Sequence, residues 1–344
     1  MKCSDYYFNM LTRDEKKAYH DIYEALSCTA SSFQTARIDP KSFAKAYMFV
    51  RLDHPEIFYS ARYSFRYYEH ADSMEVIPEY MFKPSKLRTH IQAVSARVKK
   101  VAASCRGEDD FDTEKNIHDF ILGNVTYDKL KKDYSHEIIG PLTTGVGVCE
   151  GIAKTFKILC DRLGIWCIVA LSENNPDKGI RYRHAWNIVR LGKNYYHIDA
   201  TFDNTLSRQG TARYDYFNLP DSSVFRDHEN PVYPLPPCSD GKNSYYIRKK
   251  LAFTKEEDLR KRALQYAKKE KVLVFLWRGG YLSGERIKEI CAVIDEAAAE
   301  KEKQARVFVN HAQSVFMAMF DRNVPEQNLI YENANEGEEY EGGN

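Results

Sequence analysis

The sequence predicts an α+β protein, in which helices and strands are mixed along the chain. Three observations predict this class. Apolar residues with helical spacing follow a capping-box pattern at Thr12 and Glu15. A continuous apolar run at residues 165–171 is typical of a buried strand, and two more strand-like segments follow it. Between residues 272 and 310 the pattern reads strand, helix, strand.

The chain length of 344 residues indicates two or three domains, at ~150 residues per domain. A short polar linker at residues 106–110 and four prolines between residues 231 and 237 are the candidate boundaries. The acidic segment after Tyr331 has the composition of a disordered tail. The expected parts are an N-terminal α/β accessory domain (1–105), a core (106–235), a C-terminal α/β accessory domain (236–330) and the tail (331–344).

In the N-terminal part, a helix begins at Thr12, strands are expected at 57–68 and 74–82, and Pro84 opens a helix that ends near Ser104. The strand at 57–68 is rich in aromatic residues, which allows two interpretations. The side chains form either a binding stripe or a sheet face packed on a helix, and we favour the sheet face. The aromatic residues are Phe58, Tyr59, Tyr63, Phe65, Tyr67 and Tyr68.

In the core, a glycine-rich loop at 140–148 leads into a helix that begins at Cys149 and ends at Gly164. Two strands then flank Gly192-Lys193, a two-residue loop that suits a type II′ turn. The other expected elements are a helix at 113–122, strands at 184–190 and 195–199, helices at 254–269 and 283–303, and strands at 272–277 and 306–310.

The charge balance indicates no polyanionic partner. Lys and Arg number 50, Asp and Glu number 49, and the formal net charge is +1, whereas a nucleic-acid reader normally carries a basic excess. No apolar run approaches the ~20 residues of a transmembrane helix. Residues 1–5 (MKCSD) lack the apolar region of a signal peptide, so we expect a cytoplasmic protein. An extracellular or cell-envelope location is the alternative if the natural chain continues before Met1.

The eight cysteines show no CxxC spacing, which argues against a zinc ribbon and against a thioredoxin-like site. They are also too sparse for a disulfide scaffold. Cys149 differs from the others because it follows a glycine loop and lies in the first turn of an expected helix. There the unpaired backbone N–H groups and the helix dipole would lower the pKa of a thiol. Cys149 is therefore the candidate nucleophile.

A nucleophilic cysteine needs a base and a group that orients the base. If Gly192-Lys193 is the whole loop, Leu191 faces Asn194, and the same register places His184 opposite Thr201. His184 and Asp199 are then diagonal neighbours on one face, ~7–8 Å apart at the backbone. His197 shares that face but lies further into the sheet, and we interpret it as a packed neighbour. Asp203 is the alternative orienting residue.

Three motifs resemble the transglutaminase-like core of the papain-like superfamily, as found in bacterial transglutaminase-domain proteins. They are GVCEGIAK at 147–154, RHAWN at 183–187 and YHIDAT at 196–201, with DHPEIFY at 53–59 and YDYFN at 214–218 as flanking similarities. The resemblance covers about residues 110–235. It implies a helix that carries the nucleophile and packs on an antiparallel sheet, with Cys149 as nucleophile, His184 as general base and acid, and Asp199 as orienting residue.

The resemblance also bears on the oxyanion site and on metals. Tyr127 is the preferred side-chain donor to the oxyanion, and Tyr134 and His136 are alternatives. The CxxC pairs of peptide N-glycanases are absent, and no carboxylate cluster is typical of the calcium site of animal transglutaminases. Ile152 stands where related bacterial sequences often carry an aromatic residue. We expect no cofactor and no metal.

The function implied is thiol-dependent acyl transfer on peptide or protein amides through a cysteine thioester. Hydrolysis, as in a cysteine peptidase, is favoured over crosslinking by analogy with bacterial relatives. The alternatives are a non-catalytic scaffold or binding protein of the same fold, and an acyl carrier similar to arylamine N-acetyltransferases. The expected partner is a peptide or protein substrate, and the substrate-binding residues are unknown.

Overall fold

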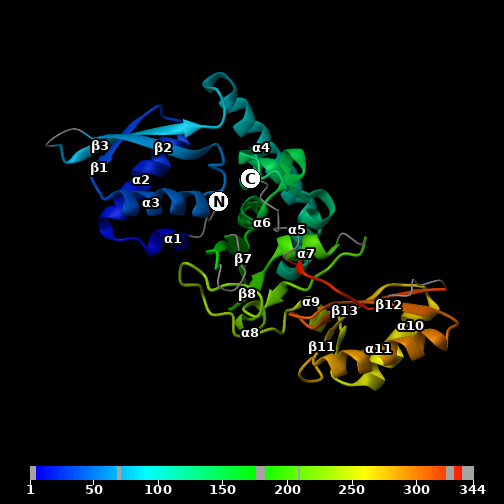
Figure 1. Ribbon diagram of the computed structural model, residues 1–344. Helices are drawn as coiled ribbons and strands as arrows, with labels where there is room; N and C mark the ends of the chain where they lie inside the picture. Colours follow the sequence, from blue (N-terminus) through cyan, green and yellow to red (C-terminus); the bar gives the residue numbers. More distant parts are fainter. Residues whose placement is uncertain (1–4, 68–70, 176–182, 208–209, 323–328, 335–344) are drawn as a thin grey trace, which may run out of the picture. The chain divides into compact units, whose positions relative to one another are not determined.

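The computed structural model describes residues 5–67, 71–175, 183–207, 210–322 and 329–334 (Figure 1). Helices and several separate sheets alternate along the chain, which confirms the α+β class. Contacts between Cα atoms divide the chain into two compact units. Unit 1 comprises Met1–Leu171 and His184–Lys193, and unit 2 comprises Ser172–Arg183 and Asn194–Asn344. The domain boundaries expected at 105/106 and 235/236 lie inside these units and stay a prediction.

The N-terminal part of unit 1 is a three-stranded antiparallel sheet in the order β1-β3-β2 with helices packed on it (Figure 1). The capping box at Thr12 and Glu15 is present and begins α2, as predicted. The ring of Tyr63 lies 4.5 Å from that of Tyr47 and 5.0 Å from that of Phe43, so this aromatic face packs on α3. The elements are α1 (Tyr6–Asn9), α2 (Arg13–Ser27), β1 (Phe33–Ala36), α3 (Pro40–Asp53), β2 (Ser60–Tyr67) and β3 (Ser73–Tyr80). Tyr68, the last residue of the expected aromatic strand, lies outside the described residues.

The second part of unit 1 centres on α6, which packs against α4, α5 and β7. It begins at Cys149, and Gly164 ends it in the left-handed conformation at φ 87°, both as predicted. Strands β6 and β7 are neighbours in one sheet. The elements are α4 (Pro84–Cys105), α5 (Asp110–Asn124), β4 (Thr126–Tyr127), η1 (Asp133–His136), η2 (Gly140–Thr144), β5 (Val146–Gly147), α6 (Cys149–Leu163), β6 (Trp166–Ser172) and β7 (His184–Leu191).

Only two residues connect β7 to β8 (Asn194–Ile198), as the sequence predicted. Gly192 has a φ of 62°, the positive value that the first central residue of a type II′ turn requires. The expected register was wrong at its far end. Strand β8 stops at Ile198, and Thr201 already belongs to α7 (Ala200–Leu206), so it has no place in a ladder.

In the rest of unit 2, strand β9 (Phe217–Leu219) pairs with β8 as the last strand of the sheet β6-β7-β8-β9, and a larger α/β layer follows. His197 of β8 is in register with Leu219 of β9. The larger sheet has the order β10-β11-β13-β12-β14. The remaining elements are α8 (Asp221–Val224), α9 (Tyr245–Arg248), β10 (Ala252–Phe253), α10 (Glu256–Lys268), β11 (Leu273–Trp277), α11 (Gly284–Ala299), β12 (Gln304–Asn310), β13 (Val315–Asp321) and β14 (Leu329–Tyr331). The expected strand, helix and strand at 272–310 are present, whereas β13 and β14 were not predicted.

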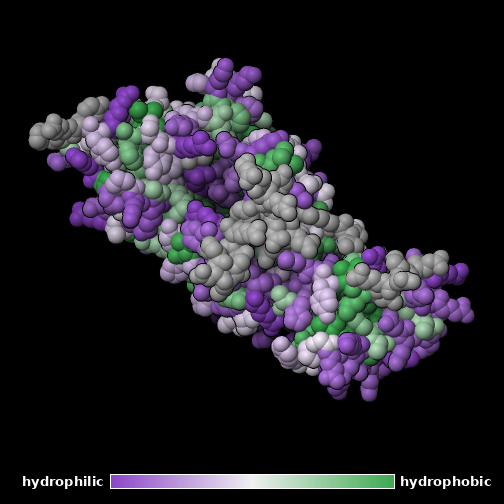
Figure 2. Space-filling view, in the orientation of Figure 1, coloured by the Kyte–Doolittle hydropathy of each residue, from purple (hydrophilic) through white to green (hydrophobic). Residues whose placement is uncertain are grey.

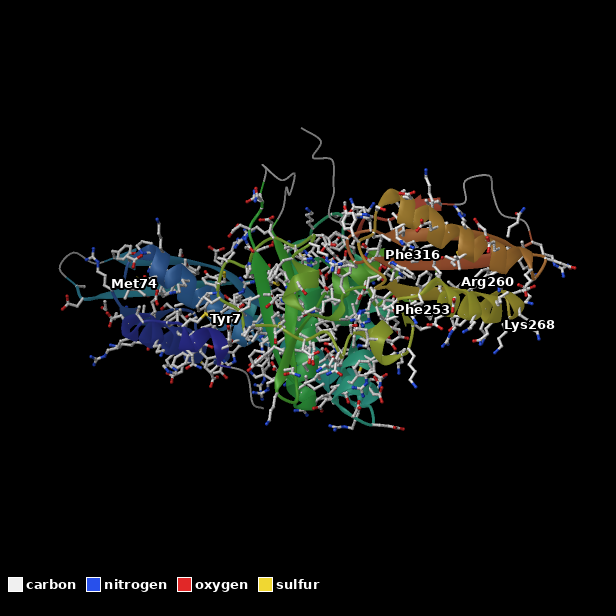
Figure 3. All side chains as sticks on the ribbon, turned by 90° about the horizontal axis from the view of Figure 1, so that it is seen from below. Tyr7, Met74, Phe253, Arg260, Lys268 and Phe316 are labelled. Atoms are coloured by element: carbon white, nitrogen blue, oxygen red, sulfur yellow. The ribbon has the colours of Figure 1, made fainter. Side chains whose placement is uncertain are left out.

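The core of this layer lies between the sheet and helices α10 and α11. Phe275 and Phe316 stack at 5.2 Å between ring centroids on paired strands. In Figure 3 the labelled Phe253 and Phe316 lie inside the layer, whereas Lys268 lies at the outer end of α10. The outer surface over α10 and α11 is mostly hydrophilic (Figure 2), as expected of two helices that bury one face.

The acidic segment at 331–344 was expected to be disordered from its start, and this was wrong for its first residues. Tyr331 belongs to β14, and Ala334 is buried. Glu332 forms an ion pair of 2.5 Å with Arg213, whose side chain is fully buried. A buried guanidinium requires such a partner. Residues 335–344 lie outside the described part of the chain. No described helix is long and apolar enough to cross a membrane.

Candidate active site

Cys149 is the first residue of α6 and is half-buried. Val148, the N-cap residue, supplies no side-chain hydrogen bond to the first turn. The backbone N–H groups of a first turn have no acceptor within the helix, and they carry the positive end of the dipole. The position is therefore suited to a thiolate. By contrast, Cys160 lies inside the same helix, and burial raises the pKa of its thiol.

The loop before Cys149 is held by backbone contacts to residues 127–135. Tyr127 of β4 is in parallel register with Gly147 of β5. The Asp128 N–H donates to the carbonyl of Gly147 at 3.0 Å, and the Val148 N–H donates to the carbonyl of Ser135 at 3.0 Å. The nucleophile loop is therefore fixed from two sides.

These contacts also place the candidate oxyanion donors. Tyr127 is buried and lies beside the loop that precedes Cys149. Tyr134 lies in η1, under the ammonium group of Lys132 at 5.8 Å. His136 faces Glu150, with 3.5 Å between Nδ1 and Oε2. All three belong to unit 1, and a role in the oxyanion site stays a prediction.

A buried network of charges lies behind the first turn of α6. The Lys154 side chain is fully buried and bonds to Glu137 at 2.9 Å and to Glu150 at 2.7 Å. Arg51 of α3 also pairs with Glu137. Burial would raise the pKa of Glu150, but Lys154, His136 and Arg51 outweigh it and hold the pKa well below its usual value. Glu150, the residue next to Cys149, thus carries a negative charge that this network balances.

His184 is the first residue of β7 and is buried. Its ring lies nearly parallel to that of Trp186, with 5.9 Å between centroids. Asn187 fixes β7 against α6, because its side-chain amide donates to the carbonyls of Ala153 at 3.0 Å and Ile168 at 3.1 Å. Cys149 and His184 therefore lie in one unit, on two elements that pack on each other.

Asp199 belongs to unit 2, where it is the N-cap of α7 rather than a strand residue. Its Oδ1 accepts hydrogen bonds from the N–H groups of Thr201 at 2.8 Å and Phe202 at 3.1 Å. These bonds hold the carboxylate of a side chain that is almost fully buried.

The sequence did not identify the partner of the second Asp199 oxygen. His228 Nε2 lies 2.9 Å from Asp199 Oδ2, and His228 Nδ1 lies 3.0 Å from Asp227 Oδ1. Asp227 in turn accepts a hydrogen bond of 2.6 Å from the Tyr216 hydroxyl. Both ring nitrogens face carboxylate oxygens, which accept hydrogen bonds, so the geometry favours the doubly protonated, cationic imidazole.

The pKa of His228 agrees with this geometry. Burial alone would lower the pKa, but the hydrogen bonds and charges of Asp199 and Asp227 outweigh it and raise the pKa above its usual value. The local signal in the sequence is a histidine next to an aspartate at 227–228. Nothing in the sequence relates this pair to Asp199, which lies almost thirty positions earlier.

The two alternatives weighed from the sequence have other partners in unit 2. His197 Nε2 lies 2.7 Å from Asp221 Oδ1, and burial lowers the pKa of His197 although Asp221 opposes the shift. Asp203 lies in α7 and accepts the N–H groups of Asp215 at 2.7 Å and Tyr216 at 3.2 Å. Its carboxylate therefore holds a buried turn of the backbone.

One group of side chains in unit 2 has the composition of a metal site. His197, Asp221 and Cys238 each offer a ligand atom, and these atoms lie within 4.8 Å of one another. The same atoms already have partners within the protein. His197 Nε2 lies 2.7 Å from Asp221 Oδ1, Asp221 Oδ2 accepts the backbone N–H of Cys238 at 3.0 Å, and the Cys238 thiol donates to the carbonyl of Pro236 at 3.6 Å. The arrangement is complete without an ion, and we assign no metal there. No two of the seven cysteines in the described ranges form a disulfide with each other.

Comparison with known proteins gives a family for part of the chain. The model of the Transglutaminase-like superfamily core matches residues 99–200. This range contains Cys149, His184 and Asp199, together with Tyr127. The sequence matches no curated protein.

Solved structures that resemble the chain include a TGase, with 13% identity over 41% of this chain and 44% of that chain and a TM-score of 0.28. A candidate cysteine protease from Cytophaga hutchinsonii is 16% identical over 40% of this chain and 61% of that one, with a TM-score of 0.26. A candidate protease from Parabacteroides distasonis is 12% identical over 40% and 36%, with a TM-score of 0.23. The chain thus spans less than two thirds of each of these proteins. Residues 99–200, with the cysteine at the start of α6, carry the sequence pattern of the Transglutaminase-like superfamily.

Proposed function

We propose that this chain is a thiol enzyme that acts on peptide or protein amides through a cysteine thioester. Cys149 is the nucleophile, His184 is the general base and acid, and Asp199 orients His184. The observation that carries the proposal is the position of Cys149, at the start of a buried helix within the superfamily domain. Hydrolysis is proposed ahead of amine transfer on the family resemblance.

The placement of Cys149 supports the nucleophile. Its helix is fixed at the first turn by the Glu150–Lys154–Glu137 network and by the Asn187 hydrogen bond to Ala153. A rigid helix start keeps the positive end of the dipole at the sulfur, which favours the thiolate. The Cys149 backbone N–H is one expected donor to the oxyanion, and Tyr127 is the proposed side-chain donor.

The environment of Asp199 supports the orienting role. A carboxylate that accepts two backbone N–H groups and one imidazole cannot rotate without breaking hydrogen bonds. In a Cys-His-Asp arrangement the orienting carboxylate sets the tautomer and angle of the catalytic imidazole. We therefore propose His228 as a positioning residue that acts through Asp199.

The reaction has two halves. The Cys149 thiolate attacks the amide carbonyl carbon and forms a tetrahedral oxyanion. When this collapses, the C–N bond breaks, and the leaving amine takes a proton from the His184 imidazolium. Neutral His184 then removes a proton from water, the hydroxide attacks the thioester, and the C–S bond breaks. The products are a carboxylic acid and the Cys149 thiolate, and His184 is again protonated. A primary amine in place of water would give transfer.

Selective alkylation tests the thiolate. The native chain receives a brief pulse of iodoacetamide at about pH 6, where an ordinary thiol of pKa ~8.5 is almost wholly protonated. Peptide mapping then gives the extent of alkylation at each cysteine. Cys28 is the internal reference, because it is exposed and lies at the C-terminal end of α2. We expect Cys149 to react well ahead of Cys28. Equal labelling of the two would contradict the enzyme and favour a non-catalytic scaffold.

A turnover assay distinguishes water from a primary amine as the acceptor of the acyl group. Wild type and C149A are incubated with a library of peptide amides, with and without a labelled primary amine. New carboxyl termini or ammonia without amine incorporation indicate hydrolysis, and amine incorporation indicates transfer. Both activities should disappear in C149A and persist in C28A. Turnover that survives in C149A would exclude the proposed nucleophile.

A further inference from the structure

The turn between β12 and β13, in the larger α/β layer of unit 2, contacts the segment that follows α7. Asn310 ends β12, Gln313 lies in the turn, and both side chains are buried. The Asn310 amide donates to Asp215 Oδ2 at 3.0 Å, and the Gln313 amide donates to the carbonyl of Ser223 at 3.2 Å. Buried amides require such partners, so these hydrogen bonds fix the turn against that segment.

The turn also reaches the carboxylate beside His228. The Gln313 amide nitrogen, which carries two hydrogens, donates to Asp227 Oδ1 at 3.1 Å as well. The same oxygen lies 3.0 Å from His228 Nδ1. The Tyr216 hydroxyl donates to the other oxygen, Oδ2, at 2.6 Å. Donors from two distant parts of the chain therefore hold both oxygens of Asp227.

Asp227 needs this support because it is a sequence neighbour of His228. Rotation about one side-chain bond would separate the two groups, and the Asp227 side chain is 15% exposed, so water competes for its oxygens. Gln313 and Tyr216 oppose this rotation. A fixed Asp227 keeps His228 in place, and His228 Nε2 lies 2.9 Å from Asp199 Oδ2.

Tyr216 also contacts Asp199 through the backbone, because its carbonyl accepts the Asp199 N–H at 2.9 Å. Tyr216 belongs to the YDYFN motif at 214–218, to which the proposed reaction gives no role. The superfamily match ends at residue 200, so the motif and Gln313 both lie outside it. Supports of Asp199 therefore come from parts of the chain that the family pattern does not cover.

We propose that Gln313 and Tyr216 are positioning residues, which hold Asp227 against His228 and thereby orient Asp199. The larger α/β layer then contributes to the candidate active site through one buried turn. This inference rests on the proposed function, because the orientation of Asp199 affects turnover only if Asp199 orients His184.

The surroundings of His228 agree with this role. Asp199 and Asp227 face its two nitrogens, the ring of Tyr216 lies 5.6 Å away between centroids, and the charge of His228 helps to lower the pKa of His197. Burial alone would lower the pKa of His228, but the hydrogen bonds and charges of Asp199 and Asp227 outweigh it. Loosening Asp227 should therefore lower the pKa of His228.

The titration of His228 gives a test that needs no turnover. The full chain has ten histidines, so ¹³C-labelled histidine gives ten ring signals, and H228Q identifies the signal of His228. Q313M and Y216F each nearly keep the side-chain volume but remove one donor to Asp227. In each variant the pKa of His228 should fall by about 0.5 to 1, the effect of one hydrogen bond. An unchanged or raised pKa in a variant would overturn the role of that residue.

Kinetics then show whether this support matters for catalysis. Q313M should lower kcat about threefold with KM unchanged. In an H228Q background the same change should lower kcat no further, because both residues act along one chain of contacts. An equal loss in both backgrounds would overturn positioning through His228.

Q304M is the matched control, because it makes the same replacement at an exposed residue of β12. It should leave kcat and the pKa of His228 as in the wild type. The two proposals fail separately. A wild-type chain that turns over no amide contradicts the proposed function, whereas the His228 titration still decides whether Gln313 and Tyr216 hold Asp227.

Discussion

His228 and Asp199 are joined by a hydrogen bond of 2.9 Å between Nε2 and Oδ2, and the other nitrogen of His228 bonds to Asp227 at 3.0 Å. A buried imidazolium between two carboxylates is stable only because each charge has a partner. Asp199 thus shares its negative charge with His228 inside unit 2. The carboxylate that we propose to orient His184 is therefore itself oriented.

We expect H228Q to lower kcat about tenfold while KM changes little. A glutamine amide still donates one hydrogen bond to Asp199 but removes the positive charge. The full charge of Asp199 would then stabilise the His184 imidazolium, so the alkaline limb of the kcat/KM profile should move to higher pH. D227N is the matched variant with an intact His228. A merely structural role would lower activity without moving the pH profile, and that result would argue against positioning.

The raised pKa of His228 predicts a pH dependence of stability. A histidine whose pKa is higher in the folded state adds stability that is fully present below its unfolded pKa of ~6.5. This contribution is lost as the pH rises through the folded pKa. Urea midpoints of wild type and H228Q should therefore differ most near pH 6 and converge at alkaline pH. A difference that grows with pH would show that the imidazole is neutral in the folded protein.

Gly151, in the first turn of α6, should tolerate no side chain. A Cβ there would overlap the carbonyl oxygen of Ser135, which also accepts the Val148 N–H. We expect G151A to lower the free energy of unfolding by about 1–3 kcal/mol and to slow alkylation of Cys149.

Gly123 of α5 is the control, because no described atom outside its own stretch of helix backbone lies within 4 Å of a Cβ at that position. G123A should be neutral or stabilise by up to about 1 kcal/mol. Urea denaturation measures both variants. Equal stability of G151A and G123A would mean that the loop before Cys149 moves freely to accept a methyl group.

The buried charges beside Cys149 should matter far more than exposed ones. K154M leaves the buried Glu137 and the half-buried Glu150 with one cation fewer, and we expect a loss of about 3 kcal/mol. The exposed pair of Arg260 and Glu300, at 2.7 Å, is the control. R260A should cost less than about 1 kcal/mol. Similar losses in the two variants, measured by urea denaturation, would show that Lys154 is hydrated in the folded protein.

Much of the local structure could be predicted because the signals are local. The capping box at Thr12, the helix start at Cys149, its end at Gly164 and the two-residue turn at Gly192 all follow from backbone requirements of a few neighbouring residues. The strands β13 and β14 were missed, because short apolar segments do not reveal their pairing partners.

Asp199 shows the limit of local sequence patterns. The expected register placed Asp199 on an extended strand, whereas the chain turns into α7 at Ala200 and uses the Asp199 carboxylate as a cap. An aspartate before a helix is itself a capping signal. The prediction instead followed the strand pattern of the preceding residues. Strand pairing and helix capping require different backbone directions at Asp199, so only one of them is possible there.

The sequence by itself determined many of the helices and strands, the family-like motifs and the candidate residues Cys149, His184 and Asp199. Only the tertiary structure decided the second partner of Asp199 and the buried position of Lys154. Helix starts and turns depend on neighbours a few residues away, which a sequence displays directly. Buried charges and cavities depend on groups that are distant along the chain and meet only when the apolar core forms, because burial then forces each polar group to find a partner.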